Sequence, residues 1–436
     1  MPLPREVETW LLVPVLAPDF SLTDNAGQSQ SLFSRRGKPV LVHFWSSATA
    51  NAQENLRQFE RRYGGWARKG LQLLAINVDE AQSVGAANAT TSAQNYVFPM
   101  TGASADVIAT YNLLFRQLFD RHRDMSVPIS FLIDTAGNIV KVYQGAVSVE
   151  KVEADFASIP TSDLQRLAKA LPFPGLHETY EFERNYLSLG FVFYERGYFG
   201  QAEQFYSQAV KDDPSSAEAL YGLGSAYLQQ QKTREARDCF ERALKLQATY
   251  PGTIPNCWNN LGTLAAREGN YELAIEDFQT ALKIDPKHTI ALQNLGSAYR
   301  QKKDWPNAKA ILERALALNP DDADANYSLG MVYAQQNDPE RAYEYLEKAI
   351  AARPAYPEAL NNLGILYLRT KRPNEAIQSF EESIRVAPAY DQAYLNLARV
   401  YAIEGDREKA KAILRELLKH YPDHPQAQEG LKQLEQ

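Results

Sequence analysis

The side chains that could carry out chemistry in this chain are few, and they lie far apart in the sequence. The two cysteines are Cys239 and Cys257, and no thiol precedes them. The six histidines are scattered, without a Cys/His/Asp cluster at metal-ligand spacing. The sequence also has no glycine-rich phosphate loop and no evident Ser-His-Asp set. These observations predict no metal and no cofactor.

Both cysteines stand beside a large aromatic residue in a segment that we expect to be helical. Cys239 precedes Phe240 and Cys257 precedes Trp258. One interpretation is a disulfide between neighbouring helices, which requires Cα atoms within about 7 Å. The other is two separate buried thiols, which we predict to be structural, reduced and slow to react because apolar burial raises the pKa of a thiol.

The segment that suggests redox chemistry contains no sulfur. Residues 40–54 read V-L-V-H-F-W-S-S-A-T-A-N-A-Q-E, an apolar strand that ends in Phe-Trp and runs into a loop and a helix. This segment resembles the redoxin group, which includes thioredoxin-like, AhpC/TSA and thiol-disulfide-exchange proteins. In that group Cys-x-x-Cys opens the helix, with its first Cys four residues after the Trp. Counted from Trp45, the two positions are Thr49 and Ala52.

An alignment with the peroxiredoxin pattern Thr-x-x-Cys also places Ala52 where the sulfur would be, so both alignments predict a degenerate site. The sequence does not distinguish natural loss from an engineered substitution. Where the redoxin group often has Asp or Asn before Phe-Trp, this chain has His43. His43 is either a proton acceptor or a histidine hydrogen-bonded within the sheet.

The redoxin resemblance covers residues 15–150 through several ordered segments. These are an opening hairpin at 17–27 with Asn-Ala-Gly as its turn, strands at 38–45 and 71–79, a short strand with Phe-Pro at 95–100, and a cis-proline segment with a hairpin at 126–140. The resemblance implies a parallel pairing of the strands at 38–45 and 71–79. It also implies that Pro128 is the cis-proline that faces the active-site loop.

A charged stretch, F-R-Q-L-F-D-R-H-R-D at 115–124, precedes the cis-proline segment. One interpretation is an anion- or partner-binding surface beside the degenerate site. The other is the solvated face of a helix that turns Phe115, Leu118 and Phe119 inward at helical spacing.

The second half of the chain repeats with a period of about 34 residues. A Leu-Gly or Leu-Ala pair is followed twelve residues later by Ala, then by a bulky residue, and most repeats end at proline. The pattern resembles tetratricopeptide repeats (TPR), helix–turn–helix units whose small residues let two helices approach closely. Seven repeats match, with a longer loop at 248–255 between the second and third. Their Leu-Gly or Leu-Ala pairs begin at Leu189, Leu223, Leu261, Leu295, Leu329, Leu363 and Leu397.

An asparagine directly precedes that leucine in four repeats, and arginines follow on or near the same helix face. Asparagine side chains in a row could hold the backbone of an extended peptide, or asparagine could simply be common at this position. The arginines would favour acidic or carboxylate ligands. The predicted peptide-binding residues are Asn260, Asn294, Asn362, Asn396, Arg267, Arg300, Arg369 and Arg399.

These patterns predict an α/β thioredoxin-like domain followed by an all-α TPR superhelical solenoid. We expect a tail at 1–14, the redoxin domain at 15–150, a linker with a short helix near 161–171 at 151–182, the repeats at 183–424 and a capping helix at 425–436. The net charge of −7 disfavours nucleic-acid binding, and no apolar run approaches the ~20 residues of a membrane span.

The stretches at 111–124 and 139–145 also suggest a resemblance to the C-terminal part of bacterial ASPIC/UnbV–FG-GAP proteins. That resemblance implies a truncated start. The compartment would be periplasmic or extracellular if an export signal lies upstream, and cytoplasmic otherwise.

The functional expectation is a scaffold or assembly protein that binds a protein or an extended, possibly acidic, peptide. The alternative is a thiol-disulfide oxidoreductase or peroxiredoxin-like enzyme whose catalytic Cys is absent in this version of the chain. A third, weaker hypothesis is catalysis by Cys239 and Cys257.

Overall fold

The computed structural model describes residues 7–24, 26–49, 52–79, 96–119, 123–170 and 184–435. The chain divides into two compact parts, Met1–Lys232 and Thr233–Gln436. The first part contains the α/β domain and the first helices of the array, and the second contains the rest of the array. Each part is described by itself.

The α/β domain is built on one six-stranded sheet in the order β1-β8-β7-β4-β5-β6. β5 pairs in parallel with both β4 and β6, and the other pairs are antiparallel. The parallel pairing expected from the redoxin resemblance is confirmed. The strands are β1 (Val7–Leu16), β4 (Val40–Trp45), β5 (Gln72–Asn77), β6 (Met100–Gly102), β7 (Ile129–Ile133) and β8 (Asn138–Gln144).

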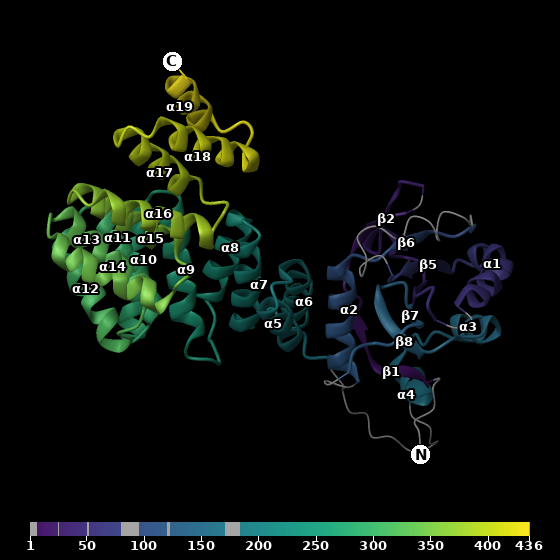
Figure 1. The fold of residues 1–436 in the computed structure, drawn as a ribbon. Helices are drawn as coiled ribbons and strands as arrows, with labels where there is room; N and C mark the ends of the chain where they lie inside the picture. The colour runs from purple at the N-terminus through teal and green to yellow at the C-terminus, as the bar shows by residue number, and fades with distance from the viewer. Residues whose placement is uncertain are drawn as a thin grey trace. The chain divides into compact units, whose positions relative to one another are not determined.

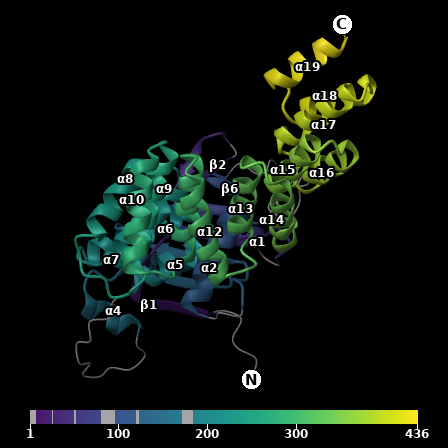
Figure 2. The same ribbon diagram turned by 90° about the vertical axis from the view of Figure 1, so that its left-hand side faces the viewer.

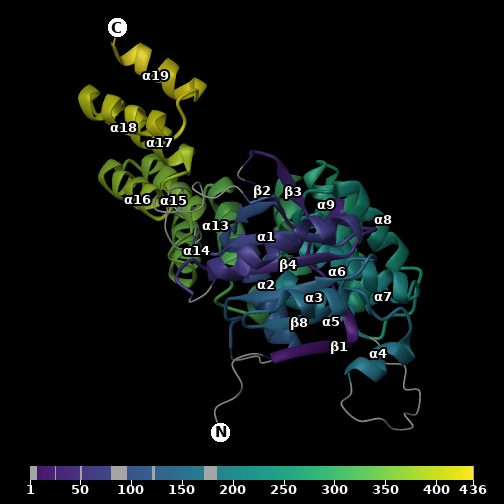
Figure 3. The same ribbon diagram turned by 90° about the vertical axis from the view of Figure 1, so that its right-hand side faces the viewer.

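Helices cover both faces of this sheet (Figures 1 and 3). α1 (Ala52–Arg68) and α3 (Val149–Phe156) lie on one face, and α2 (Ala105–Leu118) lies on the other. β4 is buried along its whole length, because its side chains alternate between these two layers. His43 packs edge-on against Phe59 of α1 at 5.1 Å between ring centroids, and Phe44 packs against Tyr111 of α2 at 4.9 Å.

Two expected boundaries of the α/β domain need correction. The expected tail 1–14 contains most of β1, which pairs with β8. The expected linker begins inside α3, and α3 belongs to the domain because Asp155 accepts hydrogen bonds from Lys141 at 2.5 Å and from the Tyr143 hydroxyl at 2.9 Å. A buried lysine needs such a partner, and only the folded structure shows which residues supply it. The expected short helix is present as α4 (Asp163–Ala170).

The other sequence expectations for this domain are largely met. The opening hairpin is β2 (Ser21–Thr23) with β3 (Ser29–Ser31), and the Val127–Pro128 peptide bond is cis. The short strand expected at 95–100 begins only at Met100, because Pro99 has no N–H and offers only its carbonyl, which accepts a bond from Ala75.

Also within the first compact part, α6 (Phe199–Asp212) contacts the extended chain that leaves β1. The Gln204 side chain accepts from the Asp19 N–H at 3.1 Å and donates to the Ala17 carbonyl at 2.7 Å. The Tyr186 hydroxyl, at the start of α5 (Tyr186–Glu195), accepts from the Leu16 N–H at 3.3 Å. The main chain of the α/β domain at residues 16–19 is therefore hydrogen-bonded to side chains of the first repeat.

The array consists of paired helices, as the repeat period predicts (Figure 2). The glycine of the Leu-Gly pair allows close packing, since a Cβ at Gly262 would lie 2.7 Å from the Phe278 ring and one at Gly364 would lie 2.6 Å from the Phe380 ring. The remaining helices are α7 (Ala217–Gln229), α8 (Thr233–Ala243), α9 (Thr253–Arg267), α10 (Tyr271–Ile284), α11 (Thr289–Gln301), α12 (Trp305–Leu318), α13 (Ala323–Gln335), α14 (Pro339–Ala352), α15 (Pro357–Arg369), α16 (Pro373–Val386), α17 (Asp391–Ile403), α18 (Arg407–His420) and α19 (Pro425–Glu435).

The loop expected at 248–255 is shorter than predicted, because α9 already begins at Thr253 and includes Pro255 near its N-terminus, where a missing N–H costs little. The expected terminal helix is α19, and Ala427 at its start is buried in a cluster with Leu414 and Leu417 of α18. Among the described residues, no helix combines the length and apolar content that crossing a bilayer requires.

Candidate functional site

Thr49 and Ala52 lie where the redoxin resemblance places them, at the junction of β4 and α1. The Ala52 N–H donates to the Thr49 carbonyl at 3.2 Å, so these residues begin and end one tight turn. Ala52 is the buried first residue of α1, and Thr49 is half-buried. A methyl and a secondary hydroxyl therefore occupy the two positions, and neither group can exchange a disulfide.

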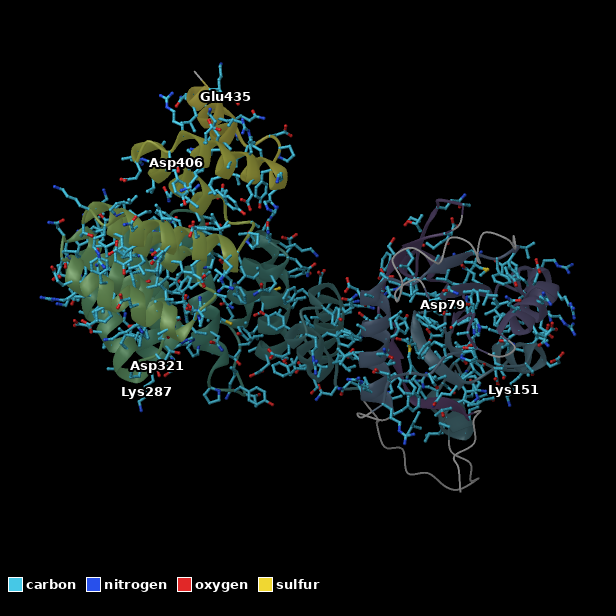
Figure 4. The ribbon with its side chains drawn as sticks, viewed as in Figure 1. Asp79, Lys151, Lys287, Asp321, Asp406 and Glu435 are labelled. Carbon is cyan, nitrogen blue, oxygen red and sulfur yellow. The ribbon has the colours of Figure 1, made fainter. Side chains whose placement is uncertain are left out.

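A carboxylate holds this loop from the neighbouring strand. Asp79 (labelled in Figure 4) follows β5. It accepts from the Ser46 hydroxyl at 2.5 Å and from the Ser47 N–H at 2.7 Å. Asn77 adds a bond at 3.2 Å. Partial burial opposes ionisation of Asp79, but these hydrogen bonds outweigh it and lower the pKa of the carboxyl below 3.8. The loop is therefore fastened by an ionised carboxylate.

Sequence reasoning missed Ser46 and Asp79, although a signal was available. Parallel strands end at the same edge of a sheet, and the register pairs Trp45 with Asn77. A serine just after one strand and an aspartate just after the next are therefore brought together. The same arrangement places Pro128 beside Trp45, because Phe44 pairs with Ile129 on the other side.

His43 lies on β4, two residues before the strand ends at Trp45, and is fully buried in the sheet. Its Nδ1 lies 2.8 Å from the Ser130 hydroxyl on β7, and its Nε2 is buried without a hydrogen-bond partner. Burial lowers the pKa of His43 to about 3, so the ring is neutral at physiological pH. This is the arrangement of a histidine hydrogen-bonded within the sheet. The Trp45 indole N–H is also buried without a partner.

The two cysteines lie in the second compact part, on α8 and α9, where both are buried and neither forms a disulfide. Burial raises the pKa of Cys239 to about 11, although the Arg242 charge opposes this shift. The disulfide alternative is therefore not what the structure contains, and the residues are two separate buried thiols.

The charged stretch at 115–124 is described only in part, since residues 120–122 lie outside the described residues. Phe115 is buried, and Leu118 and Phe119 are half-buried. Arg116 pairs with Asp124 at 2.6 Å. The described residues fit a helix with a solvated, internally paired face.

The predicted asparagines lie on α9, α11, α15 and α17, the first helices of the third, fourth, sixth and seventh repeats. We call the shared surface of α9, α11, α13, α15 and α17 the first-helix face. Each asparagine is half-buried. Three donate an amide hydrogen to a residue 35 positions earlier, on the first helix of the preceding repeat. These bonds are Asn294 to Asn259 at 3.0 Å, Asn362 to the Tyr327 hydroxyl at 3.0 Å and Asn396 to Asn361 at 2.8 Å. Sequence reasoning missed this bracing role.

Asn260 differs from the other three, because it accepts a long bond of 3.4 Å from its neighbour Asn259. The row of asparagines is therefore first of all a set of hydrogen bonds between repeats. It leaves the carboxamide oxygens of Asn294, Asn362 and Asn396 without a hydrogen-bond partner among the described residues.

The predicted arginines differ in their surroundings. Arg369 is used inside the array, where it donates to the Ala334 carbonyl at 3.0 Å. Arg300 lies near Tyr327, and its Nε is buried without a partner. Arg267 and Arg399 are exposed, and neither forms an ion pair or hydrogen bond within the described ranges. Those ranges also hold no group of three His, Cys, Asp or Glu side chains placed to bind a metal ion.

Comparison with known families agrees with this geometry. Residues 13–142 match the AhpC/TSA family, and residues 330–394 and 371–434 each match a tetratricopeptide repeat family. Residues 139–355 match the Cilia and flagella-associated protein 70 C-terminal domain.

The relatives divide between the two kinds of domain. Thiol-disulfide oxidoreductase ResA of Geobacillus thermodenitrificans is 26% identical over 154 residues, which are 35% of this chain and 80% of that protein. Tetratricopeptide repeat domain-containing protein PYG7 of Arabidopsis thaliana is 33% identical over 107 residues, 24% of this chain and 34% of that protein. Among solved structures, the APC/C hetero-tetramer Cut9-Hcn1 has a TM-score of 0.49 at 21% identity, covering 58% of this chain and 49% of that chain.

The resemblance to ASPIC/UnbV–FG-GAP proteins stays a prediction. The domain matches and the described structure support a narrower statement: the chain carries an AhpC/TSA redoxin domain in its N-terminal part and tetratricopeptide repeats in its C-terminal part.

Proposed function

We propose that this protein is a protein-binding scaffold, whose repeat array holds an extended peptide segment of a partner and whose redoxin domain carries out no thiol–disulfide exchange. The observation that carries the proposal is the state of the asparagines on the first-helix face. Three of them donate an amide hydrogen to the preceding repeat: Asn294, Asn362 and Asn396. Their carboxamide oxygens are thereby held in place and remain able to accept.

An extended peptide supplies the complementary donors. Its backbone N–H groups recur along the chain, and each asparagine oxygen can accept one regardless of the peptide's sequence. The inter-repeat bonds fix the orientation of each carboxamide before the peptide arrives, which reduces the entropy lost on binding.

The exposed arginines of the first-helix face add a preference for charge. Arg267 and Arg399 have no acidic partner within the described residues, so an acidic side chain of the peptide can pair with either one without displacing an internal ion pair. Raising the salt concentration should weaken such peptides more than neutral ones.

The proposal for the redoxin domain rests on the two positions at the head of α1. Residues 1–238 contain no cysteine, and the loop beside Thr49 is fastened by Asp79. The alternative, a thiol-disulfide oxidoreductase or peroxiredoxin-like enzyme whose cysteine is absent in this version, is favoured by relatives named as thiol-disulfide oxidoreductases. If this chain carries substitutions, the residues at positions 49 and 52 of the natural protein decide between the two: cysteine there would favour the enzyme.

The peptide-binding proposal is tested by capture of partners on the full chain, followed by affinity measurements on the peptide that is captured. The test variant is Asn396→Ala, which removes a half-buried side chain of the first-helix face. The matched control is Asn361→Ala, which removes the other end of the same 2.8 Å bond at a residue that is only 4% exposed.

We expect Asn396→Ala, combined with Asn294→Ala, to weaken the peptide roughly tenfold or more. Asn361→Ala, which removes only the bond that orients Asn396 and leaves its oxygen able to accept, should weaken the peptide clearly less. Equal losses in both variants would assign the asparagines to bracing alone. Unchanged binding after replacement of Asn260, Asn294, Asn362 and Asn396 together would place the partner elsewhere.

A further inference from the structure

Two consecutive repeats share the segment P-A-Y, which follows an arginine in one repeat and an alanine in the next. Residues 353–358 read R-P-A-Y-P-E and residues 387–392 read A-P-A-Y-D-Q, so Arg353 and Ala387 hold equivalent positions. The backbone agrees, because each residue is the C-cap of a second helix, with φ −135° and ψ 89° at Arg353 and φ −142° and ψ 83° at Ala387.

In the first of these segments, the arginine completes a cation site. The Arg353 guanidinium donates two hydrogen bonds to the Asp324 carboxylate, at 3.0 and 2.7 Å, and lies 4.5 Å from the centroid of the Tyr356 ring. The Tyr356 hydroxyl donates to the same carboxylate at 2.9 Å. A planar guanidinium matches a carboxylate and an aromatic ring in this way better than an ammonium does.

One repeat later, the acid and the tyrosine are both present. Asp324 and Glu358 are each the second residue of a first helix, and Tyr356 and Tyr390 are each the N-cap of the following first helix. Glu358 is exposed and forms no ion pair among the described residues. Glu358 and Tyr390 occupy the positions in the repeat that Asp324 and Tyr356 occupy one repeat earlier. After burial, the charge of Glu358 is the largest cause that raises the pKa of Tyr390 to about 12.

The charged groups around this second site leave it open to a cation. The Tyr327 ring lies beside Tyr356, with 5.1 Å between the ring centroids. Burial raises the pKa of Tyr327, the nearby Arg300 charge lowers this pKa, and the Glu358 charge raises it. Asp391 adds a further negative charge near Tyr390, although one of its carboxylate oxygens lies 3.1 Å from His424 Nε2. Arg385, the nearest arginine in sequence, pairs with Glu382 on its own helix.

We propose that Glu358 and Tyr390 bind the guanidinium group of an arginine supplied by a peptide partner, in the arrangement that Arg353 makes with Asp324 and Tyr356. The inference rests on the proposed scaffold function and specifies its partner, a peptide with an arginine that faces the start of α15. Acidic residues of the same peptide would face Arg267 or Arg399.

The test uses the full chain and a small probe, so that it does not depend on knowing the partner. A trifluoromethyl tag is attached through Ala389→Cys, an exposed position next to Tyr390, and its fluorine resonance is followed during titration with N-acetyl-arginine amide. N-acetyl-citrulline amide, which has nearly the same shape without the charge, is the control probe. We expect a saturable shift with arginine and none with citrulline.

Two substitutions identify the site. Glu358→Gln should weaken the arginine probe roughly tenfold, because it removes the charge of the acceptor, whereas Glu404→Gln, the same change on an exposed residue of the same array, should not. Ala387→Arg should abolish the response, since the chain then supplies its own guanidinium from a backbone position that already carries arginine one repeat earlier.

A response that is equal for citrulline, or that persists in Glu358→Gln or Ala387→Arg, overturns the inference. Failure of the wider scaffold proposal looks different, because it would appear as absence of a captured partner while the arginine probe still binds. A captured peptide whose affinity is unaffected by Glu358→Gln would keep the scaffold function and remove the arginine site.

Discussion

The loop after β4 and the first-helix face of the array differ in how their polar groups are satisfied. In the loop, Asp79 accepts from Ser46, Ser47 and Asn77, so both oxygens of its carboxylate already have partners. On the first-helix face, Asn362 has given both amide hydrogens to Tyr327 and Glu358, yet its oxygen accepts nothing among the described residues. A partner gains little from the first surface and can gain hydrogen bonds from the second.

This difference points to separate roles for the two kinds of domain. In the redoxin domain, the loop carboxylate is bonded to its neighbours, whereas the His43 Nε2 and the Trp45 indole N–H are buried without a partner. The array uses part of each polar group to hold neighbouring repeats and leaves the rest available. If the loop lacks only its sulfur, adding cysteines should give it disulfide exchange. If burial governs the titration of the two compact parts, their stabilities should respond to pH in opposite directions.

The largest change is expected from restoring sulfur to the loop. The Ala52 N–H to Thr49 carbonyl bond closes a four-residue turn, which brings the two Cα atoms within about 7 Å, close enough for a disulfide. We expect Thr49→Cys with Ala52→Cys to form a disulfide and to reduce insulin measurably. The unmodified chain should not exceed an enzyme-free blank.

Single variants provide the control, since one cysteine at either position cannot form the intramolecular bond. If the double variant forms no disulfide under oxidising conditions, the assignment of these two positions is wrong. Turnover by the unmodified chain would remove the basis for calling the loop inert.

The next effect concerns the existing thiols. With a pKa of about 11, Cys239 is almost entirely protonated at pH 8. Because only the small thiolate fraction is nucleophilic, Cys239 should react roughly a hundredfold more slowly than an ordinary thiol. Titration with a thiol reagent before and after denaturation measures this ratio. Fast labelling of either Cys239 or Cys257 in the native protein would show an accessible thiol, and a native mass two units low would show a disulfide.

How much the sequence predicted depended on whether the signal was local. The helix pairs were predictable because glycine and a bulky residue must meet at a fixed spacing, as at Gly262 and Phe278. β1 was not, because its place at the sheet edge depends on pairing with β8, more than a hundred residues away. The bracing asparagines were visible as a row, but their partners depend on how adjacent repeats stack.

The cation site shows the same limit. The repeated P-A-Y segment could be read from the sequence, as could the exchange of Arg353 for Ala387. Only the structure shows that Arg353 contacts Asp324 of the preceding first helix. This contact is what indicates that Glu358, one repeat later, lacks an arginine partner among the described residues.

Acidification should destabilise the redoxin domain through His43. The pKa of His43 is about 3 in the folded state because burial disfavours the charged ring, against 6.5 when unfolded. The unfolded chain therefore binds the proton more tightly, and stability is lost as the pH falls from 6.5 towards 3. Between pH 7 and 4.5 this group should cost about 2–3 kcal/mol, measured as reduced hydrogen-exchange protection of β4 and β7.

His43→Gln isolates this contribution, because it keeps an amide that can bond to Ser130 but does not titrate. Other carboxyls with lowered pKa values, such as Asp79, also lose stability on acidification, so the comparison is the difference between the two proteins at each pH. An identical pH dependence of the two proteins would show that His43 contributes nothing.

The smallest effect is expected in the array, and its sign is opposite. Asp277 on α10 is 6% exposed, and burial raises the pKa of its carboxyl from 3.8 to about 6, although the Arg237 charge opposes the shift. The folded state therefore binds the proton more tightly than the unfolded chain. The stability that protonated Asp277 contributes is present below pH 3.8 and is lost as the pH rises through 6. At pH 7 the ionised carboxylate would cost about 3 kcal/mol without solvent screening, and about 2 kcal/mol with it.

Asp277→Asn removes that cost without changing the shape of the side chain. We expect the variant to stabilise the second compact part at pH 7 by about 2 kcal/mol and to have little effect at pH 4, as measured by urea unfolding followed through Trp258 and Trp305. The matched control, Glu276→Gln, removes the same charge from an exposed neighbour and should change little at either pH. Equal stabilities of Asp277→Asn and the unmodified chain at pH 7 would mean that the carboxylate is solvated. The opposite pH responses of the two compact parts would then reduce to the contribution of His43 alone.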